Sequence, residues 1–153
     1  MELLIIRRAV REGDPWSGHM GLPGGHRHEE DSDDLDTAVR ETREEIGVDL
    51  TDGGELLGTL DDIRASANGQ TIELVISSFV YLVGASPSLE LSSEVAETLW
   101  VSISSLANGC YFSSHEVELN GRRKVLPSWK IHGRTVWGLT YRIVSNLLRH
   151  MAA

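Results

Sequence analysis

The sequence predicts an α+β fold, because strand-like segments surround two well-separated helical segments. A chain of 153 residues suits one domain, so residues 1–153 are expected to fold as a single unit. The hydrophobic fraction of 41% and the charged fraction of 24% are typical of globular proteins rather than disordered or coiled-coil ones. We therefore expect helices and strands layered around one core.

The chain begins with a strand and continues through a loop into a helix. Glu2–Arg8 is short, apolar and β-branched, which favours a strand. A loop over residues 9–21 and a tight turn over Leu22–Gly25 follow it. The pattern from about Asp33 to Ile46 predicts a helix.

The signals at both ends of this helix agree with its periodicity. Three residues can cap its N-terminus, and Gly47 provides a C-terminal stop. The candidate caps are Asp31, Ser32 and Asp33. One stripe of the helix, expected to pack on a core, carries Leu35, Ala38, Val39, Thr42 and Ile46.

The rest of the chain predicts further strands and a second helix. The strand patterns are Glu55–Leu60, Thr71–Val83, Thr98–Ile103, His115–Leu119 and Arg122–Leu126. Asn68-Gly69 falls in a polar connection between the first two strands. Asn120-Gly121 between the last two strongly indicates a two-residue hairpin. Val136–Met151 has helical periodicity.

The composition also limits the kinds of partner that the protein is expected to bind. The net charge of −9 argues against a nucleic-acid polymer, which requires clustered Lys and Arg. No apolar run reaches the roughly 20 residues of a membrane helix, and none resembles a signal peptide, so no membrane partner is expected. The single cysteine, Cys110, excludes an internal disulfide and suits a reducing compartment. We expect a cytoplasmic protein.

The negative charge is concentrated in one segment. Residues 29–62 hold 14 of the 23 acids and only two bases, Arg40 and Arg43, which gives 2 − 14 = −12. Such a segment is either a solvated acidic face or a site for a divalent cation, because hard cations prefer carboxylate oxygens.

The spacing of the acids favours a cation site. Glu41 and Glu45 are four residues apart and project from one side of the predicted helix, and Glu44 lies roughly 100° further round. Carboxylates this close repel one another, and a cation offsets that repulsion. The glycines of Pro23-Gly24-Gly25 allow a carbonyl to approach a bound ion closely. Loop and helix can therefore clamp a metal together.

These residues resemble the Nudix box. The sequence Arg40-Glu41-Thr42-Arg43-Glu44-Glu45-Ile46-Gly47-Val48 matches the second half of that pattern, with Thr42 in place of an apolar residue. In the first half, Gly25 precedes Arg40 by 15 positions rather than 14, and Asp31 stands where Glu is usual. This longer loop is similar to the coenzyme A diphosphatase branch of the family.

Other segments also resemble that branch. They are Arg8-Ala9, Gly18 with Leu22–Gly25, Glu94–Glu97 with Trp100-Val101, and Trp137–Thr140. The segment Glu12–Ser17 departs from the branch's basic spacing. The resemblance implies a Nudix-type α/β/α sandwich with a mixed central sheet and a catalytic loop-helix.

The resemblance also implies roles for individual residues. Glu41 and Glu45 would bind Mg²⁺ or Mn²⁺ with the carbonyl of Gly25, and Glu44 would bind a second ion or orient the attacking water. Arg40 would fix the acids, Asp31 among them. Arg8 and Gly24 would contact the substrate. The general base is expected outside the box, at Glu94 or Glu97.

The expected function is therefore the metal-dependent hydrolysis of a diphosphate bond in a nucleoside diphosphate linked to another group. Coenzyme A or acyl-CoA is the first expectation for the substrate. ADP-ribose, dinucleoside polyphosphates and other nucleotides are alternatives. A binding module of the same fold without turnover is the alternative to an enzyme.

A final expectation concerns the edge of the first strand. In the family a further strand normally precedes the one that Glu2–Arg8 resembles, and here that strand is expected to be absent. An unpaired edge invites association. A second copy could cover it, giving a homodimer, which we favour; additional N-terminal residues or another segment of the chain are the alternatives.

Overall fold

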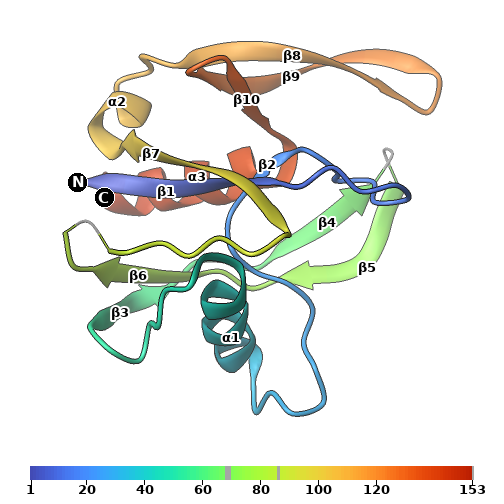
Figure 1. Cartoon of the computed structure of the whole chain (residues 1–153). Helices are drawn as coiled ribbons and strands as arrows, with labels where there is room; N and C mark the ends of the chain where they lie inside the picture. Colours follow the sequence, from blue (N-terminus) through green and yellow to red (C-terminus); the bar gives the residue numbers. More distant parts are fainter. Residues whose placement is uncertain (68–69, 86, 153) are drawn as a thin grey trace.

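The computed structural model describes residues 1–67, 70–85 and 87–152, so the Asn68-Gly69 connection lies outside the described residues. Its elements, shown in Figure 1, are β1 (Glu2–Arg8), β2 (Met20–Gly21), α1 (Asp34–Ile46), β3 (Gly54–Thr59), β4 (Ile63–Ala67), β5 (Gln70–Ile76), β6 (Phe79–Val83), β7 (Val95–Ser102), α2 (Ile103–Ala107), β8 (Phe112–Leu119), β9 (Arg122–Ile131), β10 (Arg134–Trp137) and α3 (Gly138–Met151). The α+β fold class is confirmed.

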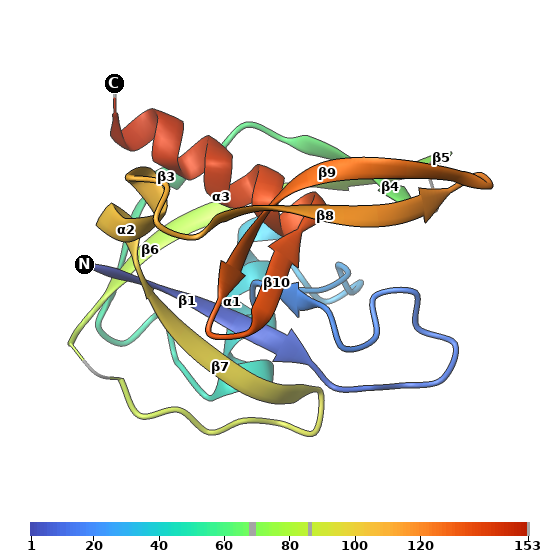
Figure 2. The same ribbon diagram turned by 90° about the horizontal axis from the view of Figure 1, so that it is seen from above.

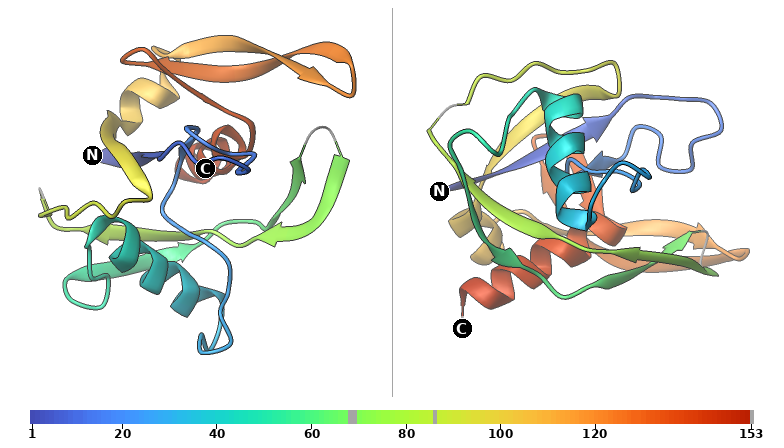
Figure 3. Two further views of the ribbon diagram at one scale, coloured as in Figure 1. Left: turned by 45° about the vertical axis from the view of Figure 1, so that its right-hand side comes forward. Right: turned by 90° about the horizontal axis from the view of Figure 1, so that it is seen from below.

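Strand β1 lies at the centre of the molecule. It pairs along its length with β7 and over two residues with β2, both antiparallel. Its neighbouring residues Ile5 and Ile6 are 0% and 1% exposed and belong to different core clusters. Ile5 packs with residues of β9, β10 and α3, whereas Ile6 packs with Ile46 of α1. Helix α3 therefore contributes to the core on the Ile5 side of β1 and helix α1 to the core on the Ile6 side, and both helices lie near β1 in Figure 3.

The described strands form four sheets rather than the single mixed sheet that we expected. Their orders are β2-β1-β7, β10-β9-β8, β3-β6 and β4-β5, and every described pairing is antiparallel. Two-residue connections join β8 to β9 and β9 to β10, and a tight turn of this length can join only antiparallel neighbours.

Both ends of α1 form as predicted. Asp33 is the N-cap, and its side chain accepts a hydrogen bond of 2.8 Å from the backbone N–H of Asp36. Gly47 ends the helix with φ of 74°, a left-handed conformation that favours glycine. Thr42 and Ile46 are buried, so the predicted stripe does face the core.

Several element boundaries differ from the predictions. The expected strand Thr71–Val83 is two strands, because the chain passes at Ser77-Ser78 from pairing with β4 to pairing with β3. Ser102 caps the short helix α2, which ends the preceding strand at that residue. Val136 and Trp137 pair with β9, so the last helix begins two residues later than predicted.

The late hairpin forms around its predicted turn. Asn120 and Gly121 have φ of 53° and 70°, as the turn in a two-residue hairpin requires. Its strands are longer than predicted, because the pairing of β8 with β9 extends to Phe112 and Trp129, and β9 continues to Ile131 beside β10. No helix of the described part of the chain is long and apolar enough to cross a membrane.

Candidate active site

The turn at Gly24-Gly25 lies against the acidic face of α1. Glu45 is only 4% exposed, and its Oε2 accepts a hydrogen bond of 3.0 Å from the backbone N–H of Gly24. A Cβ atom at Gly25 would collide with the carboxylate of Glu41, so any larger residue at this position would displace that carboxylate. The structure thus brings together Gly24, Gly25, Glu41 and Glu45.

Glu45 experiences an unfavourable environment for a negative charge. Burial raises its pKa to about 7, and the charges of Glu41 and Glu94 act in the same direction. The hydrogen bond from Gly24 and the charge of Arg8 act in the opposite direction without compensating for burial. Near neutral pH, this carboxylate is therefore partly protonated unless a cation stabilises it.

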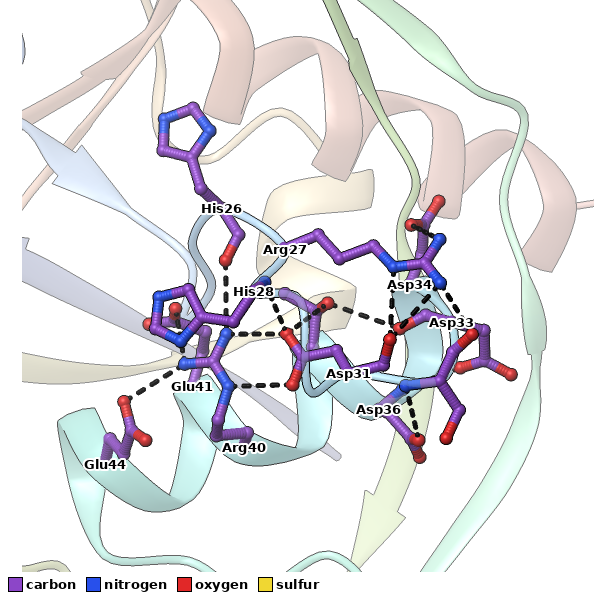
Figure 4. A network of polar contacts seen from close by, with 12 residues as sticks. His26, Arg27, His28, Asp31, Asp33, Asp34, Asp36, Arg40, Glu41 and Glu44 are labelled. Atoms are coloured by element: carbon purple, nitrogen blue, oxygen red, sulfur yellow. Dashed lines mark hydrogen bonds and ion pairs between the residues drawn. The ribbon is translucent and has the colours of Figure 1, made fainter.

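Arg40 connects the loop to the helix (Figure 4). Its Nε and Nη2 atoms donate to the two oxygens of Asp31, each at 2.9 Å, and Nη2 also donates to the carbonyl of His26 at 3.1 Å. Its Nη1 atom lies 2.8 Å from Glu41 Oε1 and 3.1 Å from Glu44 Oε2. One guanidinium group thus fixes two carboxylates of the helix relative to the loop.

Asp31 is the buried anchor of this network. It is 8% exposed and also accepts hydrogen bonds from the backbone N–H of His28 and the hydroxyl of Thr37, each at 2.9 Å. Hydrogen bonding to Arg40, followed by that to His28, holds the pKa of Asp31 well below its usual range. The Asp31 carboxylate is therefore charged throughout the physiological range, and its arginine partner stays in place.

The segment before β7 is attached to the C-terminal end of α1. The backbone N–H groups of Glu90 and Ser92 donate to the carbonyls of Ile46 and Glu45, each at 2.9 Å. These bonds satisfy carbonyls that a helix end leaves free. They bring Glu94 close enough for its charge to raise the pKa of Glu45.

The two candidates for the general base have different surroundings. Glu94 is exposed, and its side chain lies 3.2 Å from Arg11. Glu97 lies 3.0 Å from Arg7 and 2.8 Å from Arg134. Its hydrogen bond with Arg134 and the nearby charges lower the pKa of Glu97. Glu97 is thus engaged by strands β1 and β10.

Arg8 lies at the end of β1, close enough to Glu45 for its charge to influence that carboxylate. Its Nη2 is 2.7 Å from Asp14 Oδ2, and its buried Nε has no hydrogen-bond partner among the described residues. A buried donor without a partner is costly, so the position of this N–H group is unfavourable among the described residues alone.

The donor set is suited to a hard divalent cation. Glu41 and Glu45 offer carboxylate oxygens beside the Gly24-Gly25 turn, and burial makes a negative charge on Glu45 unfavourable unless a cation compensates it. No three His, Cys, Asp or Glu side chains in the described residues converge on one ion-sized position. The side-chain ligands beside the turn are the carboxylates of Glu41 and Glu45, next to backbone oxygen atoms of the turn.

The chain belongs to the Nudix family, since residues 1–127 match the NUDIX domain. Nudix hydrolases generally use divalent metal ions. Protein C14C4.10c of Schizosaccharomyces pombe, described as uncharacterized, is 44% identical over 107 residues, which are 68% of this chain and 32% of that protein. The chain therefore spans about a third of the length of this relative.

Solved structures show the same fold at low sequence identity. A C. elegans Ap4A hydrolase is 17% identical with a TM-score of 0.54, covering 70% of this chain and 73% of its own. The NUDIX domain of Shewanella oneidensis NrtR, complexed with ADP ribose, is 15% identical with a TM-score of 0.56, covering 98% and 77%. A MutT/nudix protein from Enterococcus faecalis is 19% identical with a TM-score of 0.56, covering 99% and 55%.

Sequence reasoning missed the partners of the predicted residues. Asp14, Arg11 and Arg134 lie outside the box, and only the three-dimensional fold places them beside Arg8, Glu94 and Glu97. The position of Asp14 before Pro15, in a loop, was the one local signal, because Asp often organises a turn.

A large cleft adjoins the glycine turn. Its volume is about 2070 Å³, and its lining includes Arg8, Trp16 and Gly24 as well as parts of β5 and β6. Pockets for small ligands are commonly about 300–1,000 Å³, so volume alone does not select a substrate here. Trp129, the other tryptophan that could stack on a base, is 3% exposed and packs in the core against Tyr141.

Proposed function

We propose that this chain hydrolyses a diphosphate bond in a nucleoside diphosphate linked to another group, with coenzyme A or acyl-CoA as the substrate. The observation that carries the proposal is the buried Glu45, packed with Glu41 against the Gly24-Gly25 turn. A buried acid with a raised pKa in an acidic cluster is typical of a site that works with a bound cation.

Mg²⁺ or Mn²⁺ fits the donor set formed by Glu41, Glu45 and the carbonyl of Gly25. When bound, the ion supplies neutralisation of the diphosphate charge and acidification of a water molecule. Arg40 orients Glu41 and Glu44, and Glu44 binds a second ion or orients the attacking water. Gly24 and Arg8 both line the adjoining cleft, where Gly24 contacts the substrate and the guanidinium group of Arg8 binds a phosphoryl oxygen.

We assign the general base to Glu94 rather than to Glu97. Glu94 is exposed and influences Glu45, whereas two guanidinium groups engage Glu97 and lower its pKa. A strongly ion-paired carboxylate is a poor proton acceptor. In the proposed step, the water oxygen attacks phosphorus, its proton passes to Glu94, and the bridging P–O bond breaks.

A substrate panel with product mass spectrometry tests this function. With coenzyme A and magnesium, we expect 4′-phosphopantetheine and adenosine 3′,5′-bisphosphate. ADP-ribose and diadenosine tetraphosphate are the comparison substrates, because the solved relatives bear those names. A kcat/KM for ADP-ribose at least tenfold above that for coenzyme A would contradict the choice of substrate. If no member of the panel is cleaved in a magnesium-dependent reaction, the result favours a binding module without turnover.

We also propose that the protein is a homodimer. On the edge of β1 opposite β7, the described structure pairs only Ile6 and Arg7, with β2. An open edge next to apolar side chains favours association with a second copy. Light scattering at micromolar concentration should give twice the chain mass of 16.9 kDa. Active protein with the mass of a single chain would rule the dimer out.

A further inference from the structure

The loop between β1 and β2 projects from the body of the molecule and turns back on itself (Figure 2). Its ends are tied, because the N–H of Arg8 donates to the carbonyl of His19 at 3.0 Å. Inside it, the backbone N–H of Trp16 donates to Asp14 Oδ1 at 2.9 Å, and that of Arg11 donates to Ser17 Oγ at 2.8 Å. Internal bonds of this kind make a preorganised Ω-loop.

Arg8, at the end of β1, and Arg11, in the loop, differ in how their charges are compensated. The charge of Arg8 is matched inside the loop by Asp14, whose pKa its hydrogen bond lowers. The charge of Arg11 is directed outward, where Nη1 lies 3.2 Å from Glu94 Oε1. Among the residues that the structure describes, the Arg11 side chain makes no other hydrogen bond. Most of its N–H donors are therefore free to bind an anion.

The contact between Arg11 and Glu94 is easily exchanged. Their side chains are 48% and 50% exposed, and ion pairs at such exposure contribute little to stability. The backbone around Glu94 is held independently, since its carbonyl accepts a hydrogen bond of 2.7 Å from the N–H of Ala9. The Ser92 hydroxyl also accepts a hydrogen bond of 3.2 Å from the N–H of Glu94. The contact with Arg11 is therefore not needed to hold the backbone at Glu94 in position.

From this geometry we propose that Arg11 binds a phosphoryl group of the substrate. Its guanidinium group exchanges Glu94 for phosphoryl oxygens, whose geometry its fork of donors matches. The exchange leaves the Glu94 carboxylate free to accept the proton of the attacking water. This inference rests on the proposed function, because it requires a diphosphate substrate beside Glu94.

The test is calorimetric binding of methylenebisphosphonate, a diphosphate analogue that is not hydrolysed, in the presence of magnesium. We expect Arg11→Ala to raise Kd about tenfold and Arg11→Lys to give a smaller increase, since lysine keeps the charge without the fork. Arg123→Ala is the matched control, because Arg123 is an 88% exposed arginine on β9. It should bind like the wild type.

Two results would overturn the inference and separate it from the proposed function. If the wild type binds the analogue and Arg11→Ala binds within twofold of it, only the role of Arg11 fails. If the wild type does not bind it, the proposed function fails as well. Kinetics on the best panel substrate give a second readout. Arg11→Ala should raise KM about tenfold and keep kcat within threefold, whereas a fall in kcat at unchanged KM would contradict phosphate binding.

Discussion

At the residue scale, Glu45 combines burial with a hydrogen bond and nearby charges of both signs. It accepts the N–H of Gly24, while Glu41 and Glu94 disfavour its charge and Arg8 favours it. Desolvation exceeds the favourable contributions, so the neutral acid is the stable form of this side chain over part of the physiological pH range. Two predictions follow from this balance, one for stability and one for activity.

Without metal, the free energy of unfolding contributed by Glu45 should fall as the pH rises from about 5 to 7. Its pKa is raised from 4.5 to about 7, so between these values the folded protein holds a proton that the unfolded chain has released. The free energy of unfolding then decreases as the pH rises through this range, by roughly 3 kcal/mol in total. Urea unfolding in EDTA at several pH values measures it.

The Glu45→Gln variant isolates this contribution. His19, whose pKa burial lowers, gives the opposite slope in the same range, because its unfolded form binds more protons. The difference between wild type and Glu45→Gln removes the contribution of His19. Equal pH slopes for the two proteins would show that Glu45 does not titrate in this range.

For activity, Glu45→Gln and Glu41→Gln should each lower kcat by about two orders of magnitude or more. Each substitution removes a carboxylate charge from the proposed ion site while preserving size. Circular dichroism should show an intact fold. Glu55→Gln, at an exposed acid of β3, is the control and should keep the wild-type rate. Near-normal turnover of both box variants at saturating magnesium would refute the metal assignment.

At the scale of elements, the site is a turn packed on a helix whose two ends are fixed. Asp33 caps the start of α1, and Gly47 ends it. The segment around Glu90 and Ser92 then bonds to the last carbonyls. The helix was predictable because its caps and periodicity are local. The docked segment was not, since its contacts join positions more than 40 residues apart.

Gly25→Ala tests the packing of turn on helix. The backbone of Gly25 is not left-handed, so alanine introduces no backbone strain, but its methyl group would displace the carboxylate of Glu41. We expect kcat to fall at least tenfold while Tm changes by only a few degrees. Gly84→Ala, where nothing lies within 4 Å of the added methyl group, is the control. Equal activity of the two variants would contradict a narrow metal cradle.

At the scale of the whole molecule, β1 is the central strand and contributes residues to both core clusters. Ile5 and Ile6 face two different cores, which the continuous apolar run of this strand indicated. The arrangement of sheets was not predictable, because β2 and β10 are short and are defined by partners distant in sequence. The same limit applies to the site: the box residues form a local pattern, whereas Arg11, Asp14 and Arg134 meet their partners only after folding.

The binding of Mn²⁺ to metal-free protein, measured by calorimetry near pH 6.5 in two buffers of different ionisation enthalpy, tests the central claim most directly. We predict that the wild type binds Mn²⁺ and releases protons, because Glu45 must ionise to become a ligand. Glu41→Gln should bind at least tenfold more weakly, and Glu45→Gln should in addition release fewer protons. Binding of Mn²⁺ by both variants with the affinity and proton release of the wild type would contradict a metal site at Glu41 and Glu45.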